Sequence, residues 1–297
     1  MKNLKEKKSV YVLSKSRSYR ANFNEALEFL TSNIKTFIVS LFSPAVATGL
    51  LLAFVFIIFR HIGEHFVMVL SGFSILLVTY FTAVLRQGLK EIMKNYQQTN
   101  IVSRLHWKKD MKTVLLGALP VFYLLFLQVV ILCALIALAV FLHIKLVYML
   151  FVVLSIALLL IVPFNLSLNQ LQYGDCGFFQ SIVKGFKSAK HYYGSTLILL
   201  FISLCVFLLI FVVCYLPIFI LNLTIAASNE ALSLGDPTDL PVSVYVWHFI
   251  LSLALLSIVH FSSLIWAMPQ YFHYFSLLKK DEERKKEQEK LNAVKYY

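Results

Sequence analysis

Six long stretches of apolar residues alternate with shorter polar segments along the chain of 297 residues. Each stretch is long enough to cross a hydrocarbon core of roughly 30 Å, which takes about 20 apolar residues in a helix. None of them contains Lys, Arg, Asp or Glu in its interior. The pattern therefore predicts an all-α integral membrane bundle of six transmembrane helices. We expect these helices at about 37–59, 66–85, 114–142, 146–163, 196–223 and 244–275.

The polar segments divide the six spans into three hairpins. Residues 1–36 form a basic N-terminal segment with an amphipathic helix, 37–278 form the membrane domain, and 279–297 form a charged tail. The tail favours helix and is expected to continue the sixth span. Because no polar segment is long enough to bury a core of its own, we expect no separate soluble catalytic domain.

Composition and charge give the bundle an orientation. Apolar residues make up 59% of the chain, the mean hydropathy is +0.77, and the formal net charge is +12. Of the 27 Lys and Arg residues, 25 lie in the two termini and in 86–112 and 165–195, and two lie in the other loops. Short loops rich in Lys and Arg stay in the cytoplasm, so both termini are expected there. Such charge favours anionic lipid headgroups over nucleic acid as the partner.

Two of the cytoplasmic segments resemble each other. Asn22 with Glu25, and Asp175 in the other segment, can cap helices whose apolar residues then fall on one face. Either helix can lie in the headgroup layer or pack against the spans as a connecting helix. The alignment of 23–41 with 179–197 also suggests an internal repeat. In the second helix three lysines occupy other faces and are candidate contacts for lipid headgroups: Lys184, Lys187 and Lys190.

One short motif raises the question of metal chemistry. His61, Glu64 and His65 follow the H-x-x-E-H pattern, in which two histidines share a metal and the carboxylate acts as a general base. The alternative is a solvated polar turn, since the motif lies between two spans and Gly63 weakens the helix that it needs. No glycine-rich phosphate loop, nucleophile elbow or paired carboxylate motif is present. We therefore expect no cofactor and no enzymatic activity.

Polar and proline residues inside the spans mark a possible path for a substrate through the bundle. Gln128 and His260 must find partners within the bundle, where they serve either as contacts between helices or as ligands of a substrate. Pro217 marks the best candidate for an interrupted helix, and the alternative is a simple kink. Ala45, Gly49 and Ala53 form a row of small residues that favours close packing of the first span.

Two stretches resemble known families. One is 179–200 (FQSIVKGFKSAKHYYGSTLILL), which is echoed by 23–41, and the other is 269–278 (PQYFHYFSLL) before the charged tail. These stretches are similar to bacterial polytopic membrane families of uncharacterised function, among them the membrane domain attached to some glycerophosphodiester phosphodiesterases. The resemblance implies a bacterial inner-membrane protein. It implies no activity, because the catalytic residues of that enzyme lie outside its membrane part.

Together these features predict a non-enzymatic membrane protein that contacts lipids or organises membrane-protein partners from the cytoplasmic side. The alternative is a transporter or flippase for an apolar or lipidic substrate, with Gln128, His260 and Pro217 near its path. An intramembrane enzyme is a third hypothesis, and it requires the outer His and Glu residues or His260.

Overall fold

The computed structural model describes residues 15–58, 64–141, 146–174, 176–235 and 240–294. All regular secondary structure in these segments is helical, and six of the helices, α2 to α7, are long and apolar enough to cross a membrane. The prediction of an all-α bundle with six spans is confirmed. The helices are α1 (Tyr19–Ser32), α2 (Ile34–Ile58), α3 (Glu64–Thr99), α4 (Trp107–Phe141), α5 (Leu146–Tyr173), α6 (Phe178–Ser233) and α7 (Val242–Val294).

Several helices extend well beyond the apolar stretches that predicted them. α3 runs to Thr99 and not to 85, and α6 begins at Phe178 and not near 196. α6 has 56 residues and α7 has 53, which correspond to about 84 and 80 Å at 1.5 Å per residue. Helical hydrogen bonding continues after the chain leaves hydrocarbon, whereas apolar composition marks only the part inside it. The charged run after 278 continues α7, as predicted.

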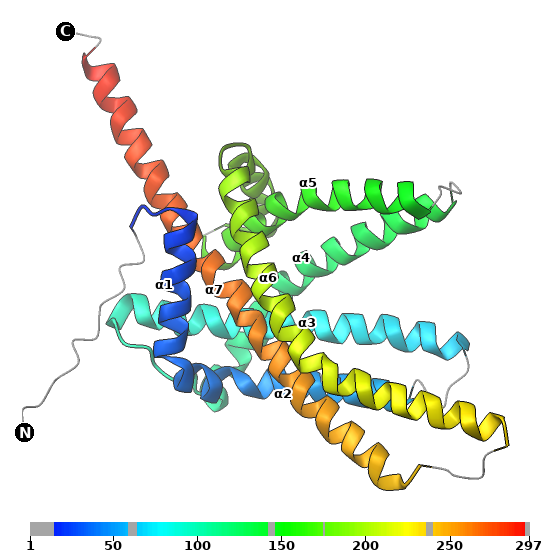
Figure 1. Ribbon diagram of the computed structural model, residues 1–297. Coiled ribbons are helices and arrows are strands. Elements are labelled where there is room, and N and C mark those ends of the chain that lie inside the picture. The colour runs from blue at the N-terminus through cyan, green and yellow to red at the C-terminus, as the bar shows by residue number, and fades with distance from the viewer. Residues whose placement is uncertain (1–14, 59–63, 142–145, 175, 236–239, 295–297) are drawn as a thin grey trace, which may run out of the picture.

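The helices converge at one end and spread at the other (Figure 1). α2 packs against α3 and α7, α4 packs against α3 and α5, and α6 packs against α5 and α7. The segments that would close the predicted hairpins, 59–63, 142–145 and 236–239, lie outside the described residues, so the three-hairpin arrangement stays a prediction. We call the converging end the basic end. It comprises α1 and residues 86–99, 164–173, 178–196 and 264–294.

The main buried core lies at this basic end. Phe29 of α1 contacts the rings of Phe37, Tyr96 and Phe272 edge to face, with ring centroids 5.0 to 6.1 Å apart. The spreading halves of the helices instead expose large apolar side chains. Examples are Phe141, Phe151, Leu209, Val213 and Trp247. Apolar exposure on this scale suits a surface that faces lipid.

The first polar segment does not form the capping pair that its sequence predicts. α1 begins at Tyr19, and its N-cap is Ser18, whose hydroxyl accepts a hydrogen bond from the Ala21 N–H at 3.3 Å. Asn22 and Glu25 lie inside the helix. Their side chains have other partners. Glu25 forms an ion pair with Arg17 at 2.6 Å, and the Asn22 amide forms a hydrogen bond with His273 of α7.

The two segments expected to be interfacial helices differ in the structure. The apolar face of α1, including Phe23, Ala26 and Leu30, is buried against α6 and α7, so α1 is a connecting helix packed within the protein. A turn at Asn33 separates α1 from α2, whereas α6 runs without a break through the aligned position. This difference weakens the hypothesis of an internal repeat. Asp175, the cap expected for the second helix, lies outside the described residues.

Small residues bring helices into backbone contact at two places. A Cβ built on Gly49 of α2 would lie 2.1 Å from Oγ of Ser257 and 2.8 Å from the backbone oxygen of Leu253, both in α7. A Cβ on Gly185 of α6 would lie 2.4 Å from the backbone nitrogen of Ser167 in α5. All three distances are shorter than the contacts that real Cβ atoms make. The small-residue face predicted on the first span is therefore buried against α7.

We expect Gly49→Leu to destabilise the bundle, since it forces α2 and α7 apart and overpacking of this kind typically costs about 1–3 kcal/mol. The measurement is the thermal unfolding midpoint of the purified protein in detergent. Gly72→Leu in α3 is the matched control, because no atom lies within 4 Å of a Cβ built there. An unchanged midpoint for Gly49→Leu would contradict the α2–α7 contact.

Candidate functional site

The start of α6 places the three predicted lysines together on the molecular surface. Lys184, Lys187 and Lys190 are all exposed. Phe179 and Val183 stand beside them with 80% and 68% of their surface exposed. The residues that pack this segment against the bundle are small ones on the other face: Ser181, Gly185 and Ala189. We call the exposed set (Phe179, Val183, Lys184, Lys187 and Lys190) the α6 basic surface. It combines cations with apolar side chains.

Tyr192 links this segment to the charged end of α7. Its hydroxyl donates a hydrogen bond to the carboxylate of Asp281, and the guanidinium of Arg284 lies 5.4 Å from the centre of its ring. Asp281 also has Lys285 four residues further along the helix. Within the described part of the chain the structure gives Asp281 a partner on α6 instead, so the tail is held at its base by α6.

A seam of buried amide side chains crosses the basic end between α5 and α7. The Asn165 amide donates to Oε1 of Gln270 at 2.7 Å, and the Asn169 amide donates to Oδ1 of Asn165 at 3.3 Å. The Tyr274 hydroxyl donates to Oε1 of Gln170, also at 3.3 Å. Sequence reasoning missed this seam because it lies beyond the end of the predicted fourth span. The signal that points to it is the spacing of Asn165 and Asn169 by one helical turn directly after the apolar run.

His273 ties three helices together at the centre of the basic end. Its Nδ1 lies 3.2 Å from the amide nitrogen of Asn22 in α1, and its Nε2 lies 3.1 Å from the hydroxyl of Thr196 in α6. Because an amide nitrogen only donates, Nδ1 accepts and Nε2 carries the proton. The ring is therefore held in its neutral form between one donor and one acceptor.

Ser276 extends the same face of α7 by one turn. Its hydroxyl accepts from the backbone N–H of Arg17 at 2.8 Å and donates to the Arg17 carbonyl at 3.2 Å. Gln270, His273 and Ser276 are spaced by three residues, and all are buried. Within PQYFHYFSLL, one of the stretches that carry the family resemblance, these polar residues hold α5, α6 and the chain leading into α1.

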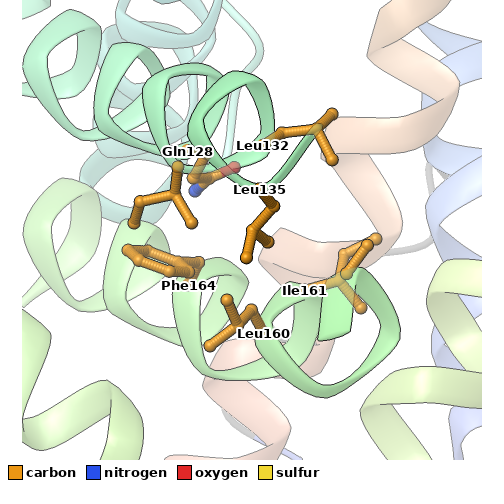
Figure 2. Close-up of a pocket in the computed structure, with 8 residues that line it drawn as sticks. Gln128, Leu132, Leu135, Leu160, Ile161 and Phe164 are labelled. Carbon is orange, nitrogen blue, oxygen red and sulfur yellow. The ribbon is translucent and has the colours of Figure 1, made fainter. Parts of the chain in front are cut away.

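Gln128 lines an apolar crevice of about 180 Å³ between α4 and α5. Figure 2 shows its amide among leucine, isoleucine and phenylalanine side chains from both helices. Gln128 is half-buried. Its amide is the polar group in a crevice whose other lining residues are apolar.

The other two residues of the predicted path lie elsewhere. His260 of α7 is buried, its ring interacts with the backbone of Phe81 in α3, and its Nε2 has no hydrogen-bond partner among the described residues. Pro217 is half-buried in α6, which continues through it without a break. Of Gln128, His260 and Pro217, only Gln128 lines a cavity among those formed by the described residues. The path through them stays a prediction.

Arg86 is a charged residue that sequence reasoning placed just outside the second span. In the structure α3 continues through it, and only 7% of its surface is exposed. It lies near Tyr173 at the end of α5. The signal in the sequence is the series Arg86, Lys90 and Lys94, which repeats every four residues and so keeps to one helical face.

Of the metal motif, His61 lies outside the described residues, and nothing is described of the side chains of Glu64 and His65. Among the described residues no group of three or more His, Cys, Asp and Glu side chains is placed to hold a metal ion.

No protein-family model, curated protein or solved structure matches the chain. The class of the protein therefore follows from the fold: it is a multi-pass, all-α membrane protein with six apolar helices. The similarity to the membrane domain found with some glycerophosphodiester phosphodiesterases stays a prediction from the two stretches that carry it.

We expect His273→Leu to destabilise the protein by about 1–3 kcal/mol, because it leaves the buried Asn22 amide and Thr196 hydroxyl without their partner. The unfolding midpoint in detergent should fall by several degrees. His191→Leu is the control, since His191 is exposed on α6. Equal midpoints for the two variants would mean that the imidazole does not join α1 to α6.

Proposed function

We propose that the protein contacts anionic lipid headgroups at the cytoplasmic face of a bacterial inner membrane, with both termini in the cytoplasm. Its role is that of a membrane component which organises lipids or partner membrane proteins, without catalysis and without a cofactor. The orientation is supported by the placement of 25 of the 27 Lys and Arg residues in segments on one side of the spans. The bacterial inner membrane is supported by the family resemblance.

The observation that carries the proposal is the α6 basic surface. This surface lies directly before the apolar part of α6. Its three lysines are exposed to solvent, and Phe179 and Val183 are exposed beside them. Apolar side chains next to cations match the boundary between acyl chains and headgroups. Each lysine near an anionic membrane surface contributes about 1 kcal/mol of attraction.

A transporter or flippase for an apolar or lipidic substrate is the second candidate. The crevice between α4 and α5 favours it, because this crevice places the Gln128 amide in an apolar opening that could admit an acyl chain. Movement of lipid between leaflets in proteoliposomes, lost on substitution of Gln128, would support this function over a purely lipid-contacting one.

We expect the triple variant Lys184→Gln, Lys187→Gln and Lys190→Gln to retain much less anionic lipid through purification. Loss of about 3 kcal/mol corresponds to roughly 100-fold weaker preference for anionic over zwitterionic lipid. The measurement is the ratio of phosphatidylglycerol to phosphatidylcholine that remains with the protein after extraction from mixed vesicles.

The charge-matched control neutralises three exposed lysines of the α7 tail, Lys285, Lys286 and Lys290. This variant has the same net charge as the first and leaves the α6 basic surface intact, so it should retain lipid as the unmodified protein does. A triple α6 variant that retains as much phosphatidylglycerol as this control would overturn the proposed lipid contact.

The orientation is tested with Cys176, which lies between α5 and α6 at the basic end. With Cys133, Cys205 and Cys214 replaced by alanine, a membrane-impermeant maleimide should label Cys176 only after the cells are permeabilised. Adding Ser243→Cys, at the exposed start of α7, should give labelling of intact cells. Labelling of Cys176 in intact cells would invert the proposed topology.

A further inference from the structure

One face of α4 leaves its side chains exposed along most of the helix. Apolar and aromatic residues recur on it every three or four positions, which keeps them on one side of a helix. These residues, which we call the α4 stripe, are Leu116, Leu119, Tyr123, Phe126, Leu127 and Val130. Leu116 and Tyr123 expose 56% and 57% of their surface, whereas Val114 and Val121 on the opposite face are buried. The stripe therefore faces away from the buried core.

The far half of the α4 stripe lines a groove of about 540 Å³. Its α4 wall is formed by Tyr123, Phe126, Leu127 and Val130, and its other wall by Phe178 and Phe179 at the start of α6. Phe178 also packs against the main buried core, so this wall is held in place. A single water needs about 10–15 Å³ of such space. The groove therefore has room for a chain of atoms, and its lining is apolar and aromatic.

Two lysines stand at the near end of the stripe. Lys109 and Lys112 are exposed, and they precede Tyr123 by 14 and 11 residues. These intervals are about four and three helical turns, so the lysines continue the face of the stripe. Asp110 lies on another face, where its carboxylate accepts a hydrogen bond from the backbone N–H of His106 at 3.0 Å. The surface thus has cations at one end and an apolar groove at the other.

The spacing between the lysines and the groove matches one leaflet of a membrane. The helix between Lys112 and Tyr123 measures about 16 Å, and half of a hydrocarbon core of roughly 30 Å is about 15 Å. The apolar run of the third span begins at Val114, just after Lys112. An acyl chain that starts from a phosphate at the two lysines therefore reaches the groove.

A second copy of the chain fits this surface less well. Copies in a membrane share one orientation, so a partner α4 would bring its own Lys109 and Lys112 to the same end of the stripe. Like charges brought together across an interface oppose association. An anionic lipid brings the opposite charge to the lysines and an apolar chain to the groove.

We propose that the α4 stripe binds one anionic phospholipid. Lys109 and Lys112 hold its phosphate by charge-assisted hydrogen bonds, and one acyl chain follows Leu116 and Leu119 into the groove beside Phe179. The inference deepens the proposed function and rests on it, because it adds a lipid site on the same cytoplasmic side. The site uses none of the three α6 lysines, so either site can be removed without the other.

The test places the full-length protein in phosphatidylcholine vesicles with a trace of phosphatidylglycerol that carries a photoreactive diazirine at the end of one acyl chain. A phosphatidylcholine probe with the same diazirine is the comparison, and mass spectrometry locates the attached lipid after irradiation. We expect attachment at 123–130 and 178–179, about tenfold or more in favour of the phosphatidylglycerol probe, because two lysines attract its headgroup. Unlabelled phosphatidylglycerol should compete for this attachment.

Variants separate this site from the α6 basic surface. Lys109→Gln with Lys112→Gln should lower groove labelling by the phosphatidylglycerol probe to the level of the phosphatidylcholine probe. The triple α6 variant removes more charge and should leave groove labelling unchanged. Val130→Trp should reduce the labelling by filling the groove, without a change in unfolding midpoint because Val130 is exposed. Val212→Trp, at an exposed position of α6, is its control.

Three results would overturn the proposal. One is equal groove labelling by the two probes, which would indicate boundary lipid only. Another is a preference for phosphatidylglycerol that the double lysine variant leaves unchanged. The third is no groove labelling by either probe, and disulfide formation between copies through Leu116→Cys would then assign the stripe to a dimer. Lipid retention that still depends on the α6 lysines would in that case leave the proposed function standing.

Discussion

Helices already surrounded by hydrocarbon gain no further hydrophobic energy when they pack against each other, and this constraint shapes the whole bundle. Close packing and hydrogen bonds must hold the helices instead. The hydrogen bonds between helices are concentrated at the basic end, where the Asn165–Gln270 bond and His273 join α1, α5, α6 and α7. Gly185 admits the α5 backbone there, and Gly49 admits the α7 backbone further along the spans. Towards the other end the helices spread and expose their apolar side chains.

The six spans were predictable because a charge inside hydrocarbon is expensive, so the absence of charged residues is a strong and local signal. The small-residue face around Gly49 was predictable for a similar reason, since the spacing of four alone places its members on one side of the helix. The ends of the helices were not predictable in this way. α3 continues past Arg86 and α6 starts before Lys184 because helical hydrogen bonding does not depend on the side chains being apolar.

The two amphipathic segments show that a helical pattern alone does not predict whether an apolar face is buried in the protein or exposed. The apolar faces of α1 and of the start of α6 look alike in sequence, but Phe23 and Leu30 are buried in the protein while Phe179 and Val183 are exposed. The deciding residues are polar or small ones within the same two helices. Asn22 bonds to His273, which fixes α1 against α7, and Gly185 lets the opposite face of α6 approach α5. An amphipathic pattern predicts that a helix has an apolar face. Whether that face contacts the protein or the membrane depends on the helices that pack against it.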